Sequence, residues 1–215
     1  MPEYRFIEWN EDNFDVRACP YVERAYRARE FAFVSDYARG KALYDHGGIY
    51  LDTDVEVLKP FDDLLSYRSF WGFEAGNFIA AGIIGAVPGH DIIKAYLGQY
   101  HTRQLSRRET SPEIVTRLWQ ERGLILNNER QVINEADLFL PSIYLYPYDY
   151  TTGNTVTSAD SYTIHHYAMT WLGPWARAKA GIKRVLAGYA GPGPVIFLRK
   201  IFSRHKNDLP PEKKG

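Results

Sequence analysis

Apolar and polar positions along the first fifty residues follow the periods of both strands and helices. Residues 4–9 alternate between apolar and polar side chains and predict a short strand. Residues 20–30 and 31–46 have helical patterns, and Gly47-Gly48 predicts the end of the second helix because glycine adopts the left-handed conformation without strain. Residues 49–51 then predict a short, fully apolar, buried strand.

The remainder of the chain continues to alternate between strands and helices. Strands are predicted at 55–58, 69–73, 78–87 and 162–167, and helices at 91–100 and 111–122. The last helix has a strong start, with Ser111 as N-cap, Pro112 at the first position and Glu113 in the first turn. This alternation predicts an α/β sandwich with a largely parallel sheet, in which ligands bind beyond the carboxyl ends of the strands.

Length and charge limit the classes of protein to consider. The 215 residues suit one domain, and the formal net charge of zero gives no reason to expect nucleic acid as a partner. The charge is uneven, because residues 176–215 hold ten Lys or Arg and only two acids, Asp208 and Glu212. We therefore expect a domain at 1–175 followed by a basic C-terminal helix or tail at 176–215.

Cysteine content and the apolar runs bear on the compartment. Cys19 is the single cysteine, so no intramolecular disulfide forms. The N-terminus lacks the apolar region of a signal peptide, and the longest apolar run, residues 78–87, is about half the length that crosses a bilayer. These features favour a cytoplasmic protein. Apolar and basic residues alternate in 195–206, which predicts a peripheral contact with an anionic membrane; a solvated tail is the equal alternative.

Asp52 and Asp54 carry the clearest chemistry. They follow the predicted strand at 49–51, and carboxylates two residues apart on an extended segment point the same way. Two facing negative charges favour a cation between them, and Mg²⁺ and Mn²⁺ prefer oxygen ligands and bridge to substrate phosphates. The pair therefore predicts a divalent metal site, with a solvated turn as the alternative.

Two further groups of polar residues are candidates for the same site. Asp36 and Arg39 lie three apart on a helix that is otherwise mostly apolar, so we expect them to meet a polar ligand; the alternative is a solvent-exposed ion pair. His165 and His166 follow one another on a predicted strand, so their side chains face opposite ways and at most one easily reaches the metal. Trp171 is a candidate neighbour of a diphosphate.

These residues together resemble glycosyltransferase family 32, which includes capsular-polysaccharide transferases and shares its nucleotide-sugar core with large clostridial glucosylating toxins. The resemblance rests on Ser35-Asp36-x-x-Arg39, Gly47-Gly48 and Tyr50-Leu51-Asp52-x-Asp54 in fixed spacing, and it continues through Gly72-Phe73-Glu74, residues 80–86 and the late His165-His166 and Thr170-Trp171 segment. It covers roughly residues 4–175. Thr170 stands where the family has Ser, which keeps the hydroxyl.

The resemblance implies a GT-A, Rossmann-like fold and a metal-dependent, anomer-retaining transfer of a hexose from a nucleotide sugar. It assigns Asp52 to ribose and metal, Asp54 to metal, and His165 or His166 to the metal shell. The residues expected to bind the donor are Ser35, Asp36, Arg39, Tyr50, Asp52, Thr170 and Trp171. Asp52, Asp54 and Arg39 are the expected catalytic residues, because the metal and Arg39 would stabilise the leaving nucleoside diphosphate. The resemblance further implies Mn²⁺ or Mg²⁺ as cofactor, UDP-hexose as first choice of donor with GDP-mannose second, and a surface glycan, free or lipid-linked, as acceptor.

Two other functions remain open on the sequence alone. Relative to the family pattern, the chain opens at what would be the second strand, so the first strand of the fold is expected to be missing. This leaves a non-catalytic nucleotide-sugar binder, or a degenerate remnant, as the first alternative. An apolar run before Asp-x-Asp also occurs in phosphotransferases of the haloacid-dehalogenase type, but Glu56 and the early Asp62-Asp63 pair fit that pattern poorly.

Overall fold

The computed structural model describes residues 3–74, 78–102, 109–149 and 154–167. The chain divides into two compact units, of which the first holds residues 1–148 and 156–171 and the second holds residues 149–155 and 172–215. In the second unit only residues 149, 154 and 155 are described. The predicted boundary between 1–175 and 176–215, and the basic tail itself, fall outside the described residues and stay predictions.

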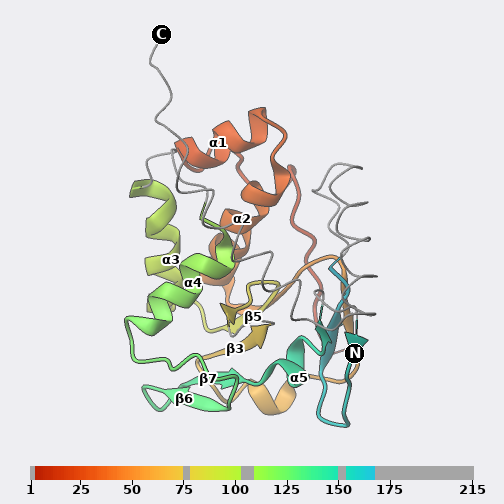
Figure 1. Ribbon diagram of the computed structural model, residues 1–215. Helices are drawn as coiled ribbons and strands as arrows, with labels where there is room; N and C mark the ends of the chain where they lie inside the picture. The colour runs from red at the N-terminus through yellow and green to blue at the C-terminus, as the bar shows by residue number, and fades with distance from the viewer. Residues whose placement is uncertain (1–2, 75–77, 103–108, 150–153, 168–215) are drawn as a thin grey trace, which may run out of the picture. The chain divides into compact units, whose positions relative to one another are not determined.

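The helices of the described chain lie between residues 20 and 145 (Figure 1). They are α1 (Pro20–Arg27), α2 (Phe31–His46), α3 (Asp91–Thr102), α4 (Ser111–Gln120), the single-turn α5 (Ser142–Leu145) and the 3-10 helix η1 (Asp62–Leu64). The prediction of helix at 31–46 is confirmed at both ends, and Gly47 ends it with φ of 66°. The N-cap of α4 is Thr110 rather than Ser111, because Glu113 accepts hydrogen bonds from the amide and the hydroxyl of Thr110.

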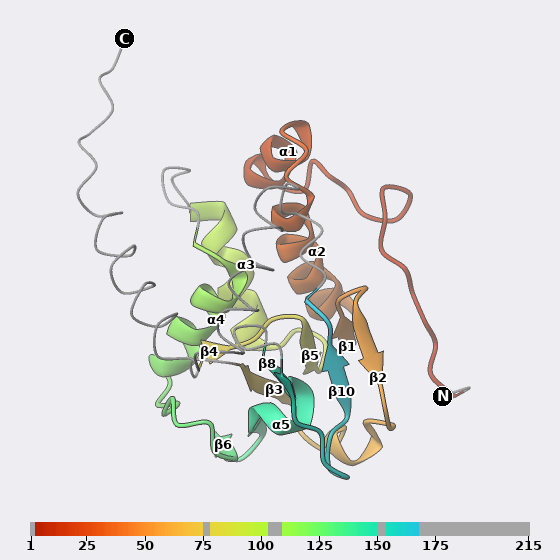
Figure 2. The same cartoon turned by 45° about the vertical axis from the view of Figure 1, so that its right-hand side comes forward.

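The strands form one larger sheet and two small ones. They are β1 (Gly48–Leu51), β2 (Val55–Val57), β3 (Ser69–Glu74), β4 (Phe78–Ile79), β5 (Ile83–Ala86), β6 (Gln131–Ile133), β7 (Asp137–Leu140), β8 (Tyr148–Asp149), β9 (Asn154–Thr155) and β10 (Thr163–His165). The larger sheet has the order β1-β5-β3-β7-β6, with β4 beside β3, while β10 pairs with β2 and β8 with β9. Figure 2 shows β10 alongside β2.

The prediction of a largely parallel sheet is wrong. Within the larger sheet of the described chain only β3 and β7 pair in parallel, and the long stretch of chain between them includes α3 and α4. The pairs β1–β5, β3–β4, β3–β5, β6–β7 and β2–β10 are antiparallel. Some of them form where the chain returns directly along a neighbouring strand, as it does from β3 to β4 and β5. The apolar run at 78–87 is thus two strands separated by residues 80–82, and the fold is mixed α/β.

A second correction concerns the N-terminal segment. Residues 4–9 alternate as a strand does but adopt no regular secondary structure. Within the described chain no strand pairs with them, and the side chains of Phe6 and Ile7 are 73% and 47% exposed. The alternation of the segment indicated a pleated conformation, but a strand forms only where a neighbour supplies hydrogen bonds. β1 also differs slightly from expectation, because it is half-buried at the edge of its sheet.

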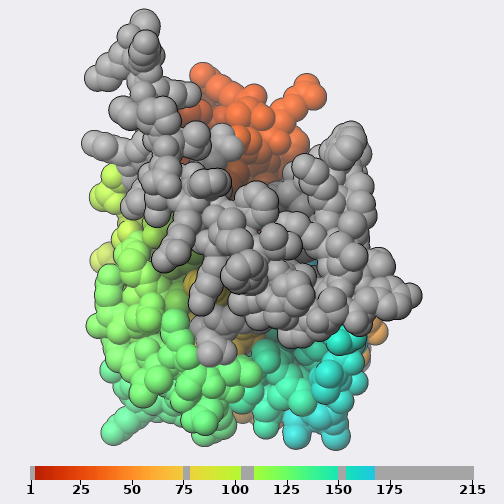
Figure 3. Space-filling model, in the orientation of Figure 1, coloured from red at the N-terminus to blue at the C-terminus, as the bar shows by residue number. Residues whose placement is uncertain are grey.

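Two apolar clusters hold the elements that position the polar residues discussed below. The larger one includes Trp71, Ile92, Trp119 and Phe139 and packs α1 to α4 against the sheet. The smaller one, around Phe61, Phe70, Leu138 and Tyr162, joins the sheet to α5 and β10. Figure 3 shows the surface over α3 and α4 in yellow-green and green.

Within the described residues no helix is both long and apolar enough to cross a membrane.

Candidate metal and donor site

The helix α2 supplies a buried ion pair. Asp36 and Arg39 lie three apart, on the face that packs inward with Val34, Leu43 and other buried residues. The Arg39 Nη2 to Asp36 Oδ1 distance is 3.0 Å, and the two side chains are only 8% and 12% exposed. Asp36 and Arg39 therefore pair with each other, as in the alternative, but the pair is buried and not exposed to solvent. Their contact with a ligand stays a prediction.

A turn after β1 brings Asp52 and Asp54 together. The backbone N–H of Asp52 donates to Gly82 O at 2.8 Å, which carries the sheet one residue beyond β1, and Val55 N–H then donates back to Asp52 O at 3.1 Å. The segment 52–54 is thus a turn, and the expectation that an extended backbone aligns the two carboxylates is wrong. The turn brings both carboxylates close to His165 instead.

His165 reaches the acids from the far end of the chain. It lies in β10 opposite Val55 of β2, and its Nε2 is 3.0 Å from Asp54 Oδ1 and 3.8 Å from Asp52 Oδ2. His166 faces the other way, as strand alternation predicts. Its Nε2 lies 3.1 Å from Glu56 Oε2, and its side chain is 54% exposed. Of the two candidate histidines, the structure brings only His165 to the acids.

The three side chains suit a divalent cation. Ligand atoms of Asp52, Asp54 and His165 all lie within 4.8 Å of one another. Ligand atoms at about 2.1 Å from Mg²⁺ are roughly 3 Å apart when they are adjacent in the octahedron and 4.2 Å apart when they are opposite. Small side-chain movements would therefore bring the three ligand atoms to these distances. Two carboxylate oxygens and an imidazole nitrogen are donors that Mn²⁺ and Mg²⁺ accept. Nδ1 of His165 is buried and has no hydrogen-bond partner within the described residues.

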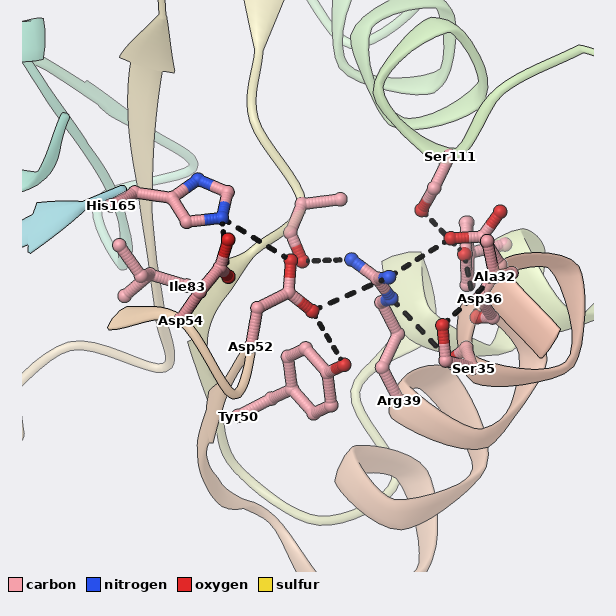
Figure 4. Close-up of polar contacts among 12 residues, drawn as sticks. Ala32, Ser35, Asp36, Arg39, Tyr50, Asp52, Asp54, Ile83, Ser111 and His165 are labelled. Atoms are coloured by element: carbon pink, nitrogen blue, oxygen red, sulfur yellow. Dashed lines mark hydrogen bonds and ion pairs between the residues drawn. The ribbon is translucent and has the colours of Figure 1, made fainter. Parts of the chain in front are cut away.

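Arg39 links α2 to this cluster (Figure 4). Its Nη1 donates to Ala81 O at 2.5 Å, Nη2 lies 3.5 Å from Asp52 Oδ1, and the guanidinium stands 4.9 Å from the centre of the Tyr50 ring. Burial alone would lower the pKa of Arg39, but Tyr50, Asp52 and Asp36 outweigh it and raise the pKa above its usual value. Arg39 is therefore a permanent positive charge behind Asp52.

Tyr50 and Ser35, both expected at the donor, have defined partners. The Tyr50 hydroxyl donates to Asp52 Oδ1 at 2.7 Å, and burial is the main reason that the pKa of Tyr50 is raised, partly offset by Arg39. The Ser35 hydroxyl donates to Ala32 O on its own helix at 2.8 Å. Thr170 and Trp171 lie outside the described residues, so their assignment to the donor stays a prediction.

A cavity lies beside the cluster. It has a volume of about 680 Å³ and is lined in part by Ser35, Arg39, Tyr50 and Thr53, with residues 4–11 along another wall. Its size falls in the range of pockets that hold small ligands. The structure thus offers space for a ligand next to Arg39 and Tyr50, which both line the cavity.

Gly82 is a site residue that the sequence did not single out. A Cβ at this position would lie 2.8 Å from Asp52 Oδ2 and 3.1 Å from His165 Cε1. The backbone at 81–82 therefore passes directly behind two of the three candidate ligands, and only glycine leaves them room. The signal was the run of small residues Ala80-Ala81-Gly82, which indicates close backbone approach but not to which residues.

Comparisons with known proteins place part of this chain beside glycosyltransferases. Residues 1–71 match the family model described as "Glycosyltransferase sugar-binding region containing DXD motif", and the matched segment contains Asp36, Arg39, Asp52 and Asp54. No solved structure matches the chain. The family match covers the α2 and β1 part of the site, while His165 lies beyond it.

Individual proteins are also similar to this chain. An uncharacterized glycosyltransferase of Acanthamoeba polyphaga mimivirus is 27% identical over 173 residues, which are 78% of this chain and 67% of that protein. Glucan organizing enzyme 1 of Cryptococcus neoformans is 37% identical over 84 residues (34% of this chain, 23% of that protein), and inositol phosphoceramide mannosyltransferase 3 of Schizosaccharomyces pombe is 27% identical over 96 residues (43% and 27%). These findings support a glycosyltransferase. The chain spans about a quarter to two thirds of the length of these relatives.

Proposed function

We propose that this chain is a metal-dependent hexosyltransferase of glycosyltransferase family 32 type, with a GT-A fold, which moves a sugar from a nucleotide-sugar donor to a glycan. The observation that carries the proposal is that Asp52 and Asp54, from the turn after β1, converge with His165 of β10, more than one hundred residues later, next to a buried Arg39. Such a set of oxygen and nitrogen donors is what a diphosphate-bound Mn²⁺ or Mg²⁺ requires.

Each residue has a separate part in this proposal. Asp52, Asp54 and His165 hold the metal, which when bound neutralises charge on the leaving nucleoside diphosphate. Arg39, which lies 3.5 Å from Asp52, is proposed to help stabilise the leaving nucleoside diphosphate, while Asp36, Ser35 and Tyr50 border the space for the donor. The family type implies retention of the anomeric configuration, with the acceptor hydroxyl attacking the face from which the diphosphate leaves. No side chain is assigned as a protein nucleophile.

The donor and acceptor follow from the same proposal. The cavity beside Tyr50 and Thr53 gives room for the nucleotide portion of a donor. A UDP-hexose is the first choice and GDP-mannose the second, and the relative named as a mannosyltransferase keeps the second choice open. The acceptor is a growing surface or capsular glycan, free or lipid-linked. A peripheral contact of the basic segment 176–215 with a membrane belongs to this proposal.

Donor turnover tests the proposal. The protein is incubated with UDP-glucose, UDP-galactose, UDP-N-acetylglucosamine or GDP-mannose and Mn²⁺, and released nucleoside diphosphate is measured with and without added oligosaccharides. Release from one donor that stops in EDTA supports the proposal. Metal-dependent binding of a nucleotide sugar without release over a broad acceptor panel would instead identify the non-catalytic binder. Release that is unaffected by EDTA would refute the metal-dependent mechanism.

A further inference from the structure

The two carboxylate oxygens of Asp52 have different partners. Oδ1 accepts the Tyr50 hydroxyl hydrogen bond at 2.7 Å and lies 3.5 Å from Arg39 Nη2. Oδ2 faces the opposite way, 3.8 Å from His165 Nε2. Figure 4 shows Asp52 between Arg39 and Tyr50 on one side and His165 with Asp54 on the other. One oxygen is therefore held by the protein and the other points toward the candidate metal position.

Tyr50 is itself fixed by strand geometry. In β1 the side chains of Ile49 and Leu51 pack with the smaller apolar cluster, while Tyr50, on the opposite face, packs with the larger one beneath α2. Arg39 lies over its ring at 4.9 Å, which restricts the ring further. The hydroxyl therefore meets Asp52 from a rigid strand, two residues before the carboxylate that it contacts.

We propose that Tyr50 is a positioning residue for the metal site, which holds Asp52 by Oδ1 so that Oδ2 alone is presented to the cation. This inference rests on the proposed function, because it requires the metal site at Asp52, Asp54 and His165. Without the hydroxyl, Oδ1 keeps only the longer 3.5 Å contact with Arg39, so the Asp52 carboxylate turns more easily about its Cβ–Cγ bond and is presented to the metal in a less fixed orientation. Hydrogen bonds to metal-bound carboxylates contribute to metal affinity in this way.

The direct test is Mn²⁺ affinity without any nucleotide, measured by the electron paramagnetic resonance signal of free Mn²⁺. Tyr50→Phe keeps the ring over Arg39 and removes only the hydroxyl. We expect its affinity for Mn²⁺ to fall about 10- to 100-fold. The matched control is Tyr162→Phe, which removes a tyrosine hydrogen bond to Asp63 that lies outside the cluster of Asp52, Asp54 and His165. Its Mn²⁺ affinity should equal that of the parent.

Three results separate the inference from the function on which it rests. If the parent and both variants bind Mn²⁺ equally, the positioning role of Tyr50 is wrong, while the metal site stands. If the parent does not bind Mn²⁺ at millimolar concentrations, the metal site and the inference both fail. If Tyr50→Phe acts only by weakening the fold, the metal-free variant will have a lower thermal midpoint than metal-free Tyr162→Phe. A loss of Mn²⁺ affinity together with this lower midpoint would overturn the inference.

Discussion

Gly82→Ala tests the arrangement of the candidate ligands without changing any of them. A Cβ at Gly82 would stand 2.8 Å from Asp52 Oδ2 and 3.1 Å from His165 Cε1, whereas ordinary van der Waals contacts begin at 3.4 Å. From 2.8 to 3.4 Å, Asp52 must retreat by about 0.6 Å, and His165 by about half as much. A catalytic or binding site tolerates displacements of only about 0.5 Å.

The expected result is a selective loss of metal affinity. Mn²⁺ binding should weaken by about ten-fold or more, as for other changes that displace a ligand. The free energy of unfolding should fall by only about 1 kcal/mol, the lower end of the range for overpacking, because the Asp52 side chain is 26% exposed and has room to move. Calorimetric titration with MnCl₂ gives the first quantity and urea denaturation the second.

Gly98→Ala is the matched control for this substitution. Gly98 lies within α3, and an added Cβ meets no atom within 4 Å. Alanine there should leave Mn²⁺ affinity unchanged and raise stability by roughly 0.5–1 kcal/mol, because glycine is a poor helix former. If Gly82→Ala binds Mn²⁺ as tightly as Gly98→Ala, then Asp52 and His165 do not act as ligands in the described positions.

Two further predictions use the contacts of single side chains. His165→Ala should lower Mn²⁺ affinity at least ten-fold, whereas His166→Ala should match the parent in the same titration; equal effects would contradict the choice of His165. Asp137 is buried, which alone would raise its pKa, but hydrogen bonds from His90 and Ser69 lower the pKa below its usual value. Ionised Asp137 therefore stabilises the folded protein fully at pH values above about 4, the pKa of an aspartate in the unfolded chain. This stabilisation is lost as the pH falls through the lower pKa that Asp137 has in the folded protein. Asp137→Asn should cost about 1.5–3 kcal/mol at pH 7 and progressively less in urea titrations toward pH 3; a cost independent of pH would contradict it.

Local patterns predicted the parts of the fold that depend on local forces. The helix at 31–46 was predicted at both ends because its apolar periodicity and Gly47 act within a few residues. The prediction for residues 4–9 was wrong because pairing depends on a neighbouring strand, which periodicity does not reveal. The prediction of a parallel sheet was wrong for the same reason, because periodicity does not reveal that both β4 and β5 run antiparallel to β3.

In the site, too, the sequence predicted what depends on nearby residues and missed what depends on tertiary structure. Asp52, Asp54, Asp36 and Arg39 were found from spacing and composition because they lie within twenty residues of one another. The choice between His165 and His166 needed the register of β10 against β2, and Gly82 needed the path of the chain behind Asp52. The burial of the Asp36–Arg39 pair also required tertiary structure, because the same spacing occurs on solvent-exposed helices.

Nucleotide binding with and without metal tests the central claim most directly. UDP and GDP are titrated calorimetrically into the 215-residue chain in Mn²⁺ and again in EDTA, alongside Asp54→Asn, which removes one ligand charge while keeping the size of the side chain. We predict that one nucleotide binds the parent in Mn²⁺, that binding disappears in EDTA, and that it disappears in the variant while circular dichroism shows an intact fold. Equal binding by Asp54→Asn and the parent in Mn²⁺ would contradict the metal-dependent site.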